Sequence, residues 1–126
     1  MEKIIINDHI QGDPLSEENL NKTLESVNEI RLLLPKKTIW LYTGYTVNMF
    51  ELYNCDHTII EVNPRNNNDE INFKRETIIR KCDIVVDGKY IDSQRNMSKR
   101  WAGSDNQRVI DINKSLQKGE VILYYN

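Results

Sequence analysis

The chain has 126 residues, of which 39% are hydrophobic and 29% are charged. These proportions are typical of a soluble globular protein, and the length predicts a single domain over residues 1–126. A net charge of −2 and a pI near 5.7 argue against nucleic-acid binding, which usually shows as a basic surface. No hydrophobic run approaches the ~20 residues that cross a membrane, and the N-terminus is too polar for a signal peptide. We therefore expect a cytoplasmic protein that binds neither nucleic acid nor membrane.

The N-terminal third predicts a strand, a helix and a second strand. Three consecutive isoleucines favour a strand from Lys3 to Ile10. After a break at residues 12–14, hydrophobic residues at helical spacing predict a helix that is capped by Ser16 and ended by Pro35. A short hydrophobic run with aromatic and β-branched residues then predicts a buried strand over residues 38–43.

The remaining elements continue the alternation of strands and helices. We expect a short helix over residues 47–53, a strand or irregular insert over 57–62 and a loop over 64–69. A helix over 73–81, a buried strand over 83–86 and a polar, loop-rich segment over 89–104 follow. The last predicted elements are a strand (108–111), a helix (112–118) that Gly119 ends, and a final strand (121–125). This order predicts an α/β fold with a mostly parallel sheet and crossover helices.

Small and polar residues follow three of the predicted strands. These are Gly12-Asp13-Pro14, Thr43-Gly44 and Asp87, which precedes Gly88. The carboxyl ends of parallel strands meet at one edge of a sheet, where α/β proteins bind ligands. The same residue types are also the commonest formers of strand-to-helix turns. A shallow ligand cleft and ordinary turns are therefore both open interpretations of this edge.

The densest cluster of polar and aromatic side chains lies near the C-terminus. Arginine offers a planar fork for carboxylate or phosphate, while Asn and Gln carry both donors and acceptors. The cluster is either a binding surface or a hydrogen-bonded loop that Trp101 anchors. Its members are Arg100, Trp101, Asn106, Gln107 and Arg108.

The sequence predicts neither a metal site nor a catalytic residue. The two histidines, His9 and His57, lie far apart and have no partner at ligand spacing. The two cysteines, Cys55 and Cys82, are too distant for a local metal clamp. Widely separated cysteines in a chain without a signal peptide are typical of reduced, structural thiols.

Three segments together resemble one enzyme family. They are GDPL at residues 12–15, WLYTGYT at 40–46 and RWAGSDNQRVID at 100–111. They are similar to the activating proteins of anaerobic ribonucleotide reductases, which are radical S-adenosylmethionine enzymes. The resemblance implies a partial (β/α) barrel and, upstream, a C-x3-C-x2-C motif whose thiolates hold a [4Fe–4S] cluster.

The resemblance also implies a cofactor-binding edge. In that family a Gly-Gly-Glu/Asp-Pro motif after the second strand hydrogen-bonds the methionine amino group of S-adenosylmethionine. Here the motif reads Gln11-Gly12-Asp13-Pro14, so that Gln11 replaces the first glycine. A vestigial S-adenosylmethionine edge would then consist of Gly12, Asp13, Pro14, Thr43, Gly44 and Asp87.

The chain departs from the family in its thiols. It has no C-x3-C-x2-C motif. By alignment the chain would begin at the family's second strand, so we expect a truncated form of the barrel. Cleavage of S-adenosylmethionine needs an electron from the cluster. We therefore expect this polypeptide alone to carry neither S-adenosylmethionine nor a [4Fe–4S] cluster and to perform no radical chemistry. The strand from Lys3 to Ile10 would become an unpaired edge, which favours a homodimer or a partner protein there.

Three functional hypotheses follow. The first is a degenerate or truncated activating protein that acts as a regulator or inhibitor by binding a protein, either the large anaerobic reductase subunit or another target; a phage or mobile element could carry it. The second is the C-terminal part of a working glycyl-radical activase whose cluster motif lies on a missing or separate segment. The third is a small nucleotide-binding α/β domain.

Overall fold

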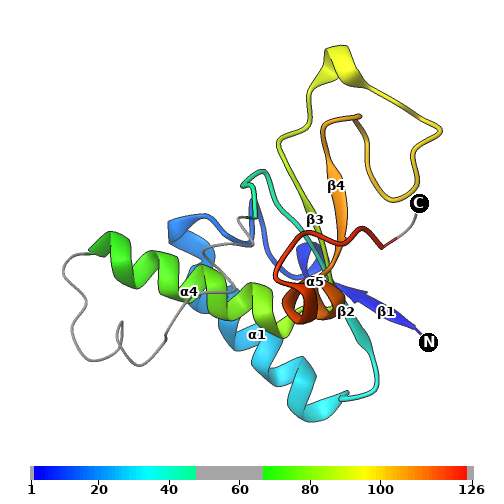
Figure 1. Ribbon diagram of the computed structural model, residues 1–126. Coiled ribbons are helices and arrows are strands. Elements are labelled where there is room, and N and C mark those ends of the chain that lie inside the picture. Colours follow the sequence, from blue (N-terminus) through cyan, green and yellow to red (C-terminus); the bar gives the residue numbers. More distant parts are fainter. Residues whose placement is uncertain (1, 48–66, 125–126) are drawn as a thin grey trace.

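The computed structural model describes residues 2–47 and 67–124, and within them four strands form one sheet (Figure 1). The strands lie in the order β1-β2-β3-β4, so that β1 and β4 are its edges. β1, β2 and β3 are parallel, whereas β4 runs antiparallel to β3. The α/β class and the mostly parallel sheet are therefore confirmed. The strands are β1 (Lys3–Ile5), β2 (Thr38–Tyr42), β3 (Ile84–Asp87) and β4 (Arg108–Asp111).

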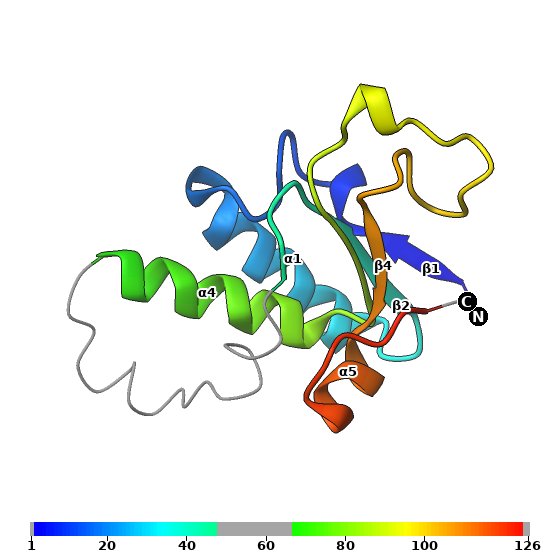
Figure 2. The same cartoon turned by 45° about the horizontal axis from the view of Figure 1, so that its top comes forward.

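Three α-helices of the described residues cover one face of this sheet (Figure 2). Two of them are crossovers between parallel strands, since α1 joins β1 to β2 and α4 precedes β3. α1 packs against α4, and α4 packs against α5. None of the described helices is both long enough and hydrophobic enough to cross a bilayer. The helices are α1 (Leu20–Leu33), α4 (Asn67–Lys81) and α5 (Ile112–Lys118), with single 3-10 turns η1 (Ile6–Asp8), η2 (Glu17–Asn19) and η3 (Asp92–Gln94).

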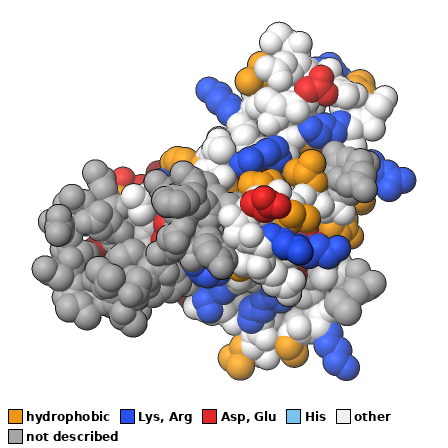
Figure 3. All heavy atoms as spheres, in the orientation of Figure 1, with side chains coloured by type: hydrophobic (Ala, Val, Ile, Leu, Met, Phe, Trp, Pro, Cys, Tyr) orange, Lys and Arg blue, Asp and Glu red, His pale blue; other side chains and the backbone are white. Residues whose placement is uncertain are grey.

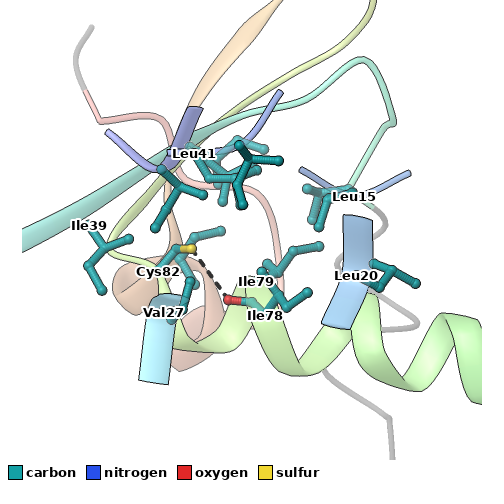
Figure 4. Close-up of a cluster of buried hydrophobic side chains, with 14 residues drawn as sticks. Leu15, Leu20, Val27, Ile39, Leu41, Ile78, Ile79 and Cys82 are labelled. Atoms are coloured by element: carbon teal, nitrogen blue, oxygen red, sulfur yellow. Dashed lines mark hydrogen bonds between the residues drawn. The ribbon is translucent and has the colours of Figure 1, made fainter. Parts of the chain in front are cut away.

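The alternation of side chains along each strand divides the hydrophobic residues between the two faces. On the helical face, Leu41 of β2 and Val85 of β3 pack with Val27 of α1 and with residues of α4 and α5 (Figure 4). On the opposite face, Trp40 and Val86 form a smaller cluster with their neighbours on the sheet. The loop between β3 and β4 covers part of this second face with Trp101 and Ala102.

The first strand is shorter than the sequence predicts. β1 ends at Ile5, because the chain then turns into η1 and buries Ile6 completely in the helical-face core. Asn7 replaces the missing strand: its side-chain amide donates to the Tyr42 carbonyl and accepts from the Tyr42 N–H, both at 2.9 Å. One side chain thus satisfies backbone groups of β2 that a longer β1 would have paired.

Two other boundaries differ from prediction. The helix expected from residue 73 begins at Asn67, so the loop expected over 64–69 ends earlier. Over the described part of the final strand expected at 121–125, residues 121–124 form an isolated bridge from Leu123 to Ile110 and no regular strand. Ser115 accepts the Ile122 N–H at 2.8 Å instead. Of the helix expected over 47–53 only residue 47 is described, and the element expected over 57–62 lies outside the described residues.

Candidate functional site

The turns that follow β1 and β2 meet at the carboxyl edge of the parallel strands. They line a shallow depression of 290 Å³ together with the segment that follows β3. The edge that the sequence predicts from Gly12, Asp13, Thr43 and Gly44 is therefore assembled in one place, although its role in binding stays a prediction. The full lining is Asn7, Gly12, Asp13, Tyr42, Thr43, Gly44, Gly88, Lys89, Tyr90 and Gln107.

The carboxylate of Asp13 ties the two turns together. It accepts the Leu15 N–H at 2.9 Å and the Gly44 N–H at 2.8 Å. The Thr43 hydroxyl lies 2.9 and 3.2 Å from its two oxygens. A carboxylate has about four acceptor positions, and these three donors occupy three of them within the protein. Asp13 therefore acts on the site by positioning the backbone of both turns.

The turn that carries Gly12 and Pro14 is held from the helix side. Asn19 donates to the carbonyls of Gln11 at 3.0 Å and of Asp13 at 2.9 Å. The buried Thr23 hydroxyl donates to the Pro14 carbonyl at 2.8 Å. Gly12 has φ +88°, a conformation that only glycine adopts without strain. The geometry of this turn is thus fixed without any ligand contact.

Asp87 does not line the depression but forms a buried ion pair with Arg108. Its side chain is 1% exposed and lies 2.6 Å from Nη2 and 3.0 Å from Nε of Arg108. It also accepts the Val47 N–H at 2.7 Å, while Arg108 donates to the Val47 carbonyl at 3.0 Å. The hydrogen bonds that Arg108 donates to the Asp87 carboxylate raise the pKa of Arg108, so the guanidinium stays charged. The pair joins β3, β4 and the segment after β2.

The two amide side chains of the C-terminal cluster fix the loop between β3 and β4. Gln107 accepts the N–H groups of Gly103 and Ser104 at 2.8 and 3.1 Å and donates to the Gly88 carbonyl at 3.0 Å. Asn106 donates to the Lys89 carbonyl at 2.7 Å and accepts the Ser104 hydroxyl at 2.6 Å. These bonds link both ends of residues 88–107, which project from the sheet as a loop (Figure 1). We call this segment the 88–107 loop.

The remaining two members of the cluster lie on the far face of the sheet from the helices. Trp101 has φ +63° and packs against Trp40 and Tyr124, with ring centroids 5.6 and 5.2 Å apart. The guanidinium of Arg100 lies 5.5 Å from the Trp101 ring centroid. A positive φ is costly for a tryptophan, so this packing has to compensate for the strain. Arg100 and Trp101 are thus separated from the depression that Gln107 lines.

The described residues do not fit an iron–sulfur cluster. Cys82 is fully buried, its thiol lies 3.3 Å from the Ile78 carbonyl (Figure 4), and burial raises its pKa to about 12. A cluster needs several thiolates, and the only other cysteine, Cys55, lies outside the described residues. Among residues 2–47 and 67–124 no group of three His, Cys, Asp or Glu side chains could hold a metal ion.

Comparison with known proteins identifies the family of this chain. A family described as "4Fe-4S single cluster domain" matches residues 8–110. The chain belongs to this family. It is 30% identical over 98 residues to the anaerobic ribonucleoside-triphosphate reductase-activating protein of Vibrio cholerae, a match over 78% of the chain and 50% of the relative. The resemblance to activating proteins that the sequence indicated is confirmed.

Two further relatives show the same extent of match. The chain is 31% identical over 98 residues to the activating protein of Escherichia coli K12, covering 78% of the chain and 50% of that protein. It is 31% identical over 100 residues to the activating protein of phage T4, covering 78% of the chain and 47% of the phage protein. The chain thus spans about half the length of the curated relatives that it matches. No solved structure matches it.

Sequence reasoning missed several residues of the depression. Asn7 and Tyr42 contribute side chains or backbone from the ends of β1 and β2, and Lys89 and Tyr90 come from the start of the 88–107 loop. Asn7 was missed because the strand was expected to run on to Ile10; the polar residue directly after the isoleucine run was the available signal for an earlier strand end. Nothing in the local pattern indicated Tyr90, because its position depends on how the loop folds back.

Proposed function

We propose that this chain acts through a protein partner in the activation of an anaerobic ribonucleoside-triphosphate reductase. Its relatives are named as activating proteins of that enzyme. The chain provides a docking scaffold, and it performs no radical chemistry by itself. Its sheet and helices form part of a partial (β/α) barrel of the radical S-adenosylmethionine type.

The 88–107 loop is the feature that supports this proposal most. A segment of this length without a regular helix or strand is unusual unless it is functional. Side-chain bonds hold it in one shape: Asn96 donates to Asp105 at 2.8 Å, and Lys99 donates to the carbonyls of Asp105 and Gln107. A loop that is rigid and projects from the sheet is suited to recognise a partner with little ordering cost.

The surface of this loop has the composition of a docking site. Met97 is 83% exposed, and Tyr90 and Ile91 are also exposed. Arg95 lies beside Met97, with its guanidinium 3.4 Å from the sulfur. Methionine, tyrosine and arginine are the side chains that protein interfaces favour. The reductase is therefore expected to contact Met97 and Arg95 directly.

A binding measurement with purified reductase tests this proposal. The full chain is immobilised, and the anaerobic ribonucleoside-triphosphate reductase of Vibrio cholerae is passed over it without oxygen. The Met97→Glu variant should weaken binding about tenfold or more, because it places a charge in the apolar part of the contact. Lys118→Glu, at an exposed position on α5, is the control and should bind normally. If the folded chain does not bind the reductase, the proposal fails.

The second hypothesis, one part of a working activase, draws support from another observation. β1 has a neighbour on one side only among the described strands, so the sheet can accept a further strand there. A separate polypeptide with the C-x3-C-x2-C motif could supply both the strand and the thiolates. Reconstitution with iron and sulfide tests this directly: the chain alone should give no cluster absorbance, and the two polypeptides together should give it.

The nucleotide-binding hypothesis rests on the depression alone. Asp13 accepts three hydrogen bonds within the protein, and Asp87 does not line the depression and is paired with Arg108. A ligand there would bind through the backbone of the turns and through Lys89, Tyr90 and Asn7. Calorimetry with S-adenosylmethionine and common nucleotides separates this hypothesis from the docking scaffold, which predicts no heat with any of them.

A further inference from the structure

Two sulfur-containing side chains lie among the described residues, and they differ completely in exposure. Cys82 is fully buried, and its thiol donates to the Ile78 carbonyl at 3.3 Å. Met97, in the 88–107 loop, is 83% exposed. In the space-filling view, hydrophobic atoms are visible among polar ones where this loop projects at the top of the molecule (Figure 3). An oxidant in solution can therefore reach the Met97 sulfur but not the Cys82 sulfur.

The chemistry of the two sulfur atoms leads to the same order of reactivity. Peroxides attack the thiolate form of cysteine. Burial raises the pKa of the Cys82 thiol to about 12, so almost no thiolate is present near neutral pH. A thioether has no proton to lose, and its oxidation depends on access to the sulfur. Of these two side chains, Met97 should be the one that a peroxide oxidises in the folded chain.

The backbone around Met97 is held in a tight turn that does not depend on its side chain. The Asn96 side-chain oxygen accepts the Ser98 N–H at 2.9 Å, and the Asn96 carbonyl accepts the Lys99 N–H at 3.3 Å. The Asn96 N–H donates to the Gly103 carbonyl at 3.1 Å. Met97 also belongs to neither hydrophobic cluster of the described residues. A chemical change at its sulfur should therefore leave the loop and the fold intact.

The Met97 sulfur has a charged neighbour. The guanidinium of Arg95, which is also exposed, lies 3.4 Å from it. A thioether sulfur is only a weak acceptor, so both side chains remain available to a partner. An oxygen atom added to that sulfur would be a strong acceptor within reach of the same guanidinium, and hydrogen bonds from a charged donor are the stronger kind. Oxidation would thus pair the two side chains with each other.

We propose that Met97 is a reversible oxidation site, and that methionine sulfoxide at this position prevents the reductase from docking on the 88–107 loop. An oxygen atom of hydrogen peroxide passes to the thioether sulfur, which is oxidised to the sulfoxide, and the rest of the peroxide leaves as water. A methionine sulfoxide reductase reverses the step: a dithiol is oxidised to a disulfide, and the oxygen leaves as water. This inference rests on the proposed function, because it concerns the surface that is proposed to contact the reductase.

The modification would remove both side chains that we expect the reductase to contact. Methionine suits protein contacts because its thioether is apolar, flexible and polarizable. A sulfoxide is polar, so its burial in the same contact costs desolvation. Its oxygen would in addition hold the guanidinium of Arg95 away from the partner. The relatives are named as activating proteins of an anaerobic reductase. Loss of docking in the presence of a peroxide would separate the chain from such an enzyme under oxidising conditions.

The test oxidises the full chain and then measures its binding to the reductase. The chain is treated with dilute hydrogen peroxide and afterwards with dithiothreitol, which reverses sulfenic acids and disulfides but leaves methionine sulfoxide in place. Mass spectrometry of peptides shows whether Met97 has gained an oxygen atom. Binding to the anaerobic ribonucleoside-triphosphate reductase of Vibrio cholerae is measured without oxygen for the untreated chain, the oxidised chain and the oxidised chain after repair by methionine sulfoxide reductases.

Two variants separate Met97 from the other sulfur atoms. Met97→Leu is the matched control, because it keeps the volume and the hydrophobic character but has no sulfur. It retains Met1, Met49 and both cysteines, so it reports any effect of their oxidation. Met97→Gln places a neutral polar side chain at the same position without any treatment. Circular dichroism verifies that each variant and the oxidised chain are folded.

We expect peroxide to convert Met97 and to weaken binding of the unmodified chain about fivefold or more, and repair should restore it. Met97→Leu should bind within about threefold of the unmodified chain both before and after peroxide, and Met97→Gln should bind like the oxidised chain. Failure of peroxide to convert Met97, equal binding of the oxidised and untreated chains, or the same loss in Met97→Leu overturns this inference and leaves the proposed function standing. If the untreated chain does not bind the reductase, the proposed function fails, and this inference fails with it.

Discussion

Replacing Arg108 by methionine should lower the free energy of unfolding by about 3 kcal/mol. Asp87 is 1% exposed, and two of its three hydrogen-bonded contacts are with the Arg108 guanidinium. Methionine fills much of the same volume but leaves the carboxylate with only the Val47 N–H. Removing one partner of a buried ion pair typically costs about 3–5 kcal/mol, because the other charge stays desolvated. The Arg108 side chain is 34% exposed, so water can enter the gap, and we expect the lower end of that range.

Urea unfolding followed by tryptophan fluorescence measures this cost. Trp40 and Trp101 pack together on the face of the sheet to which Val109 of β4 contributes its side chain. Their emission should therefore report loss of this packing. The matched control is Lys118→Met, which removes an exposed cation from α5 and should change stability by less than about 0.5 kcal/mol. A cost below about 1 kcal/mol for Arg108→Met would contradict the reasoning, because it would mean that the carboxylate is solvated.

A double variant separates the two causes of the loss. Asp87→Asn removes the charge but keeps an oxygen that can accept the Val47 N–H. Added to Arg108→Met, it should restore part of the lost stability, since no uncompensated charge then remains buried. If the double variant is instead less stable than Arg108→Met alone, the loss comes from packing or from the bond to the Val47 carbonyl.

Three further predictions concern separate positions. Asp13→Ala should cost about 2 kcal/mol in urea unfolding, because it leaves the N–H groups of Leu15 and Gly44 without their acceptor; an unchanged midpoint would contradict this. Gly88→Ala should cost about 1–3 kcal/mol, since φ is +98° there; calorimetric melting measures it. In a Cys55→Ser background, Cys82 should react with a thiol reagent only on unfolding. Burial raises the folded pKa of the Cys82 thiol to about 12, above the unfolded value. The contribution of the protonated thiol to the free energy of unfolding is therefore complete below pH ~9 and is lost as the pH rises from ~9 to ~12. Cys82→Ala should flatten that decline.

Local pattern predicted the strands that are buried on both faces and the helices that have an amphipathic pattern. β2 and β3 are short hydrophobic runs, α1 has helical spacing before Pro35, and Gly119 ends α5 with φ +74° as expected. The direction of β4 was not predicted. A parallel strand needs a crossover, and residues 88–107 contain only the short turn η3. The absence of a helical pattern there was the available signal.

The errors at both chain ends have one physical cause. An isoleucine run favours a strand locally, but Ile6 gains more by entering the core formed by α1 and α4, so β1 ends after Ile5. Near the C-terminus, Leu123 makes an isolated bridge to Ile110, while the Ser115 hydroxyl accepts the N–H of Ile122. Both outcomes depend on partners far away in the sequence, which strand propensity does not include.

For the candidate site, the sequence predicted where residues lie better than what they do. Strand ends placed Asp13 and Thr43 at one edge, and the structure joins them by a hydrogen bond of 2.9 Å. The same reasoning treated Asp87 as part of that edge, but it forms a buried ion pair with Arg108 instead. A one-dimensional pattern cannot show that an arginine 21 residues away takes both oxygens of a carboxylate.

The outer edge of β1 and the end of α1 both differ from what stable proteins usually show. Proteins usually protect an edge strand with charge, proline or a covering element, and they rarely place consecutive leucines in solvent. Here the outer edge of β1 is unpaired within the described chain, and Leu32–Leu34 are exposed at the end of the adjacent helix. Elsewhere the local choices agree with the fold, as at the Asp111 cap of α5 and the Gly119 stop. Exposed hydrophobic side chains also occur on the 88–107 loop, at Tyr90, Ile91 and Met97, so they mark two separate surfaces of the described chain as contact surfaces.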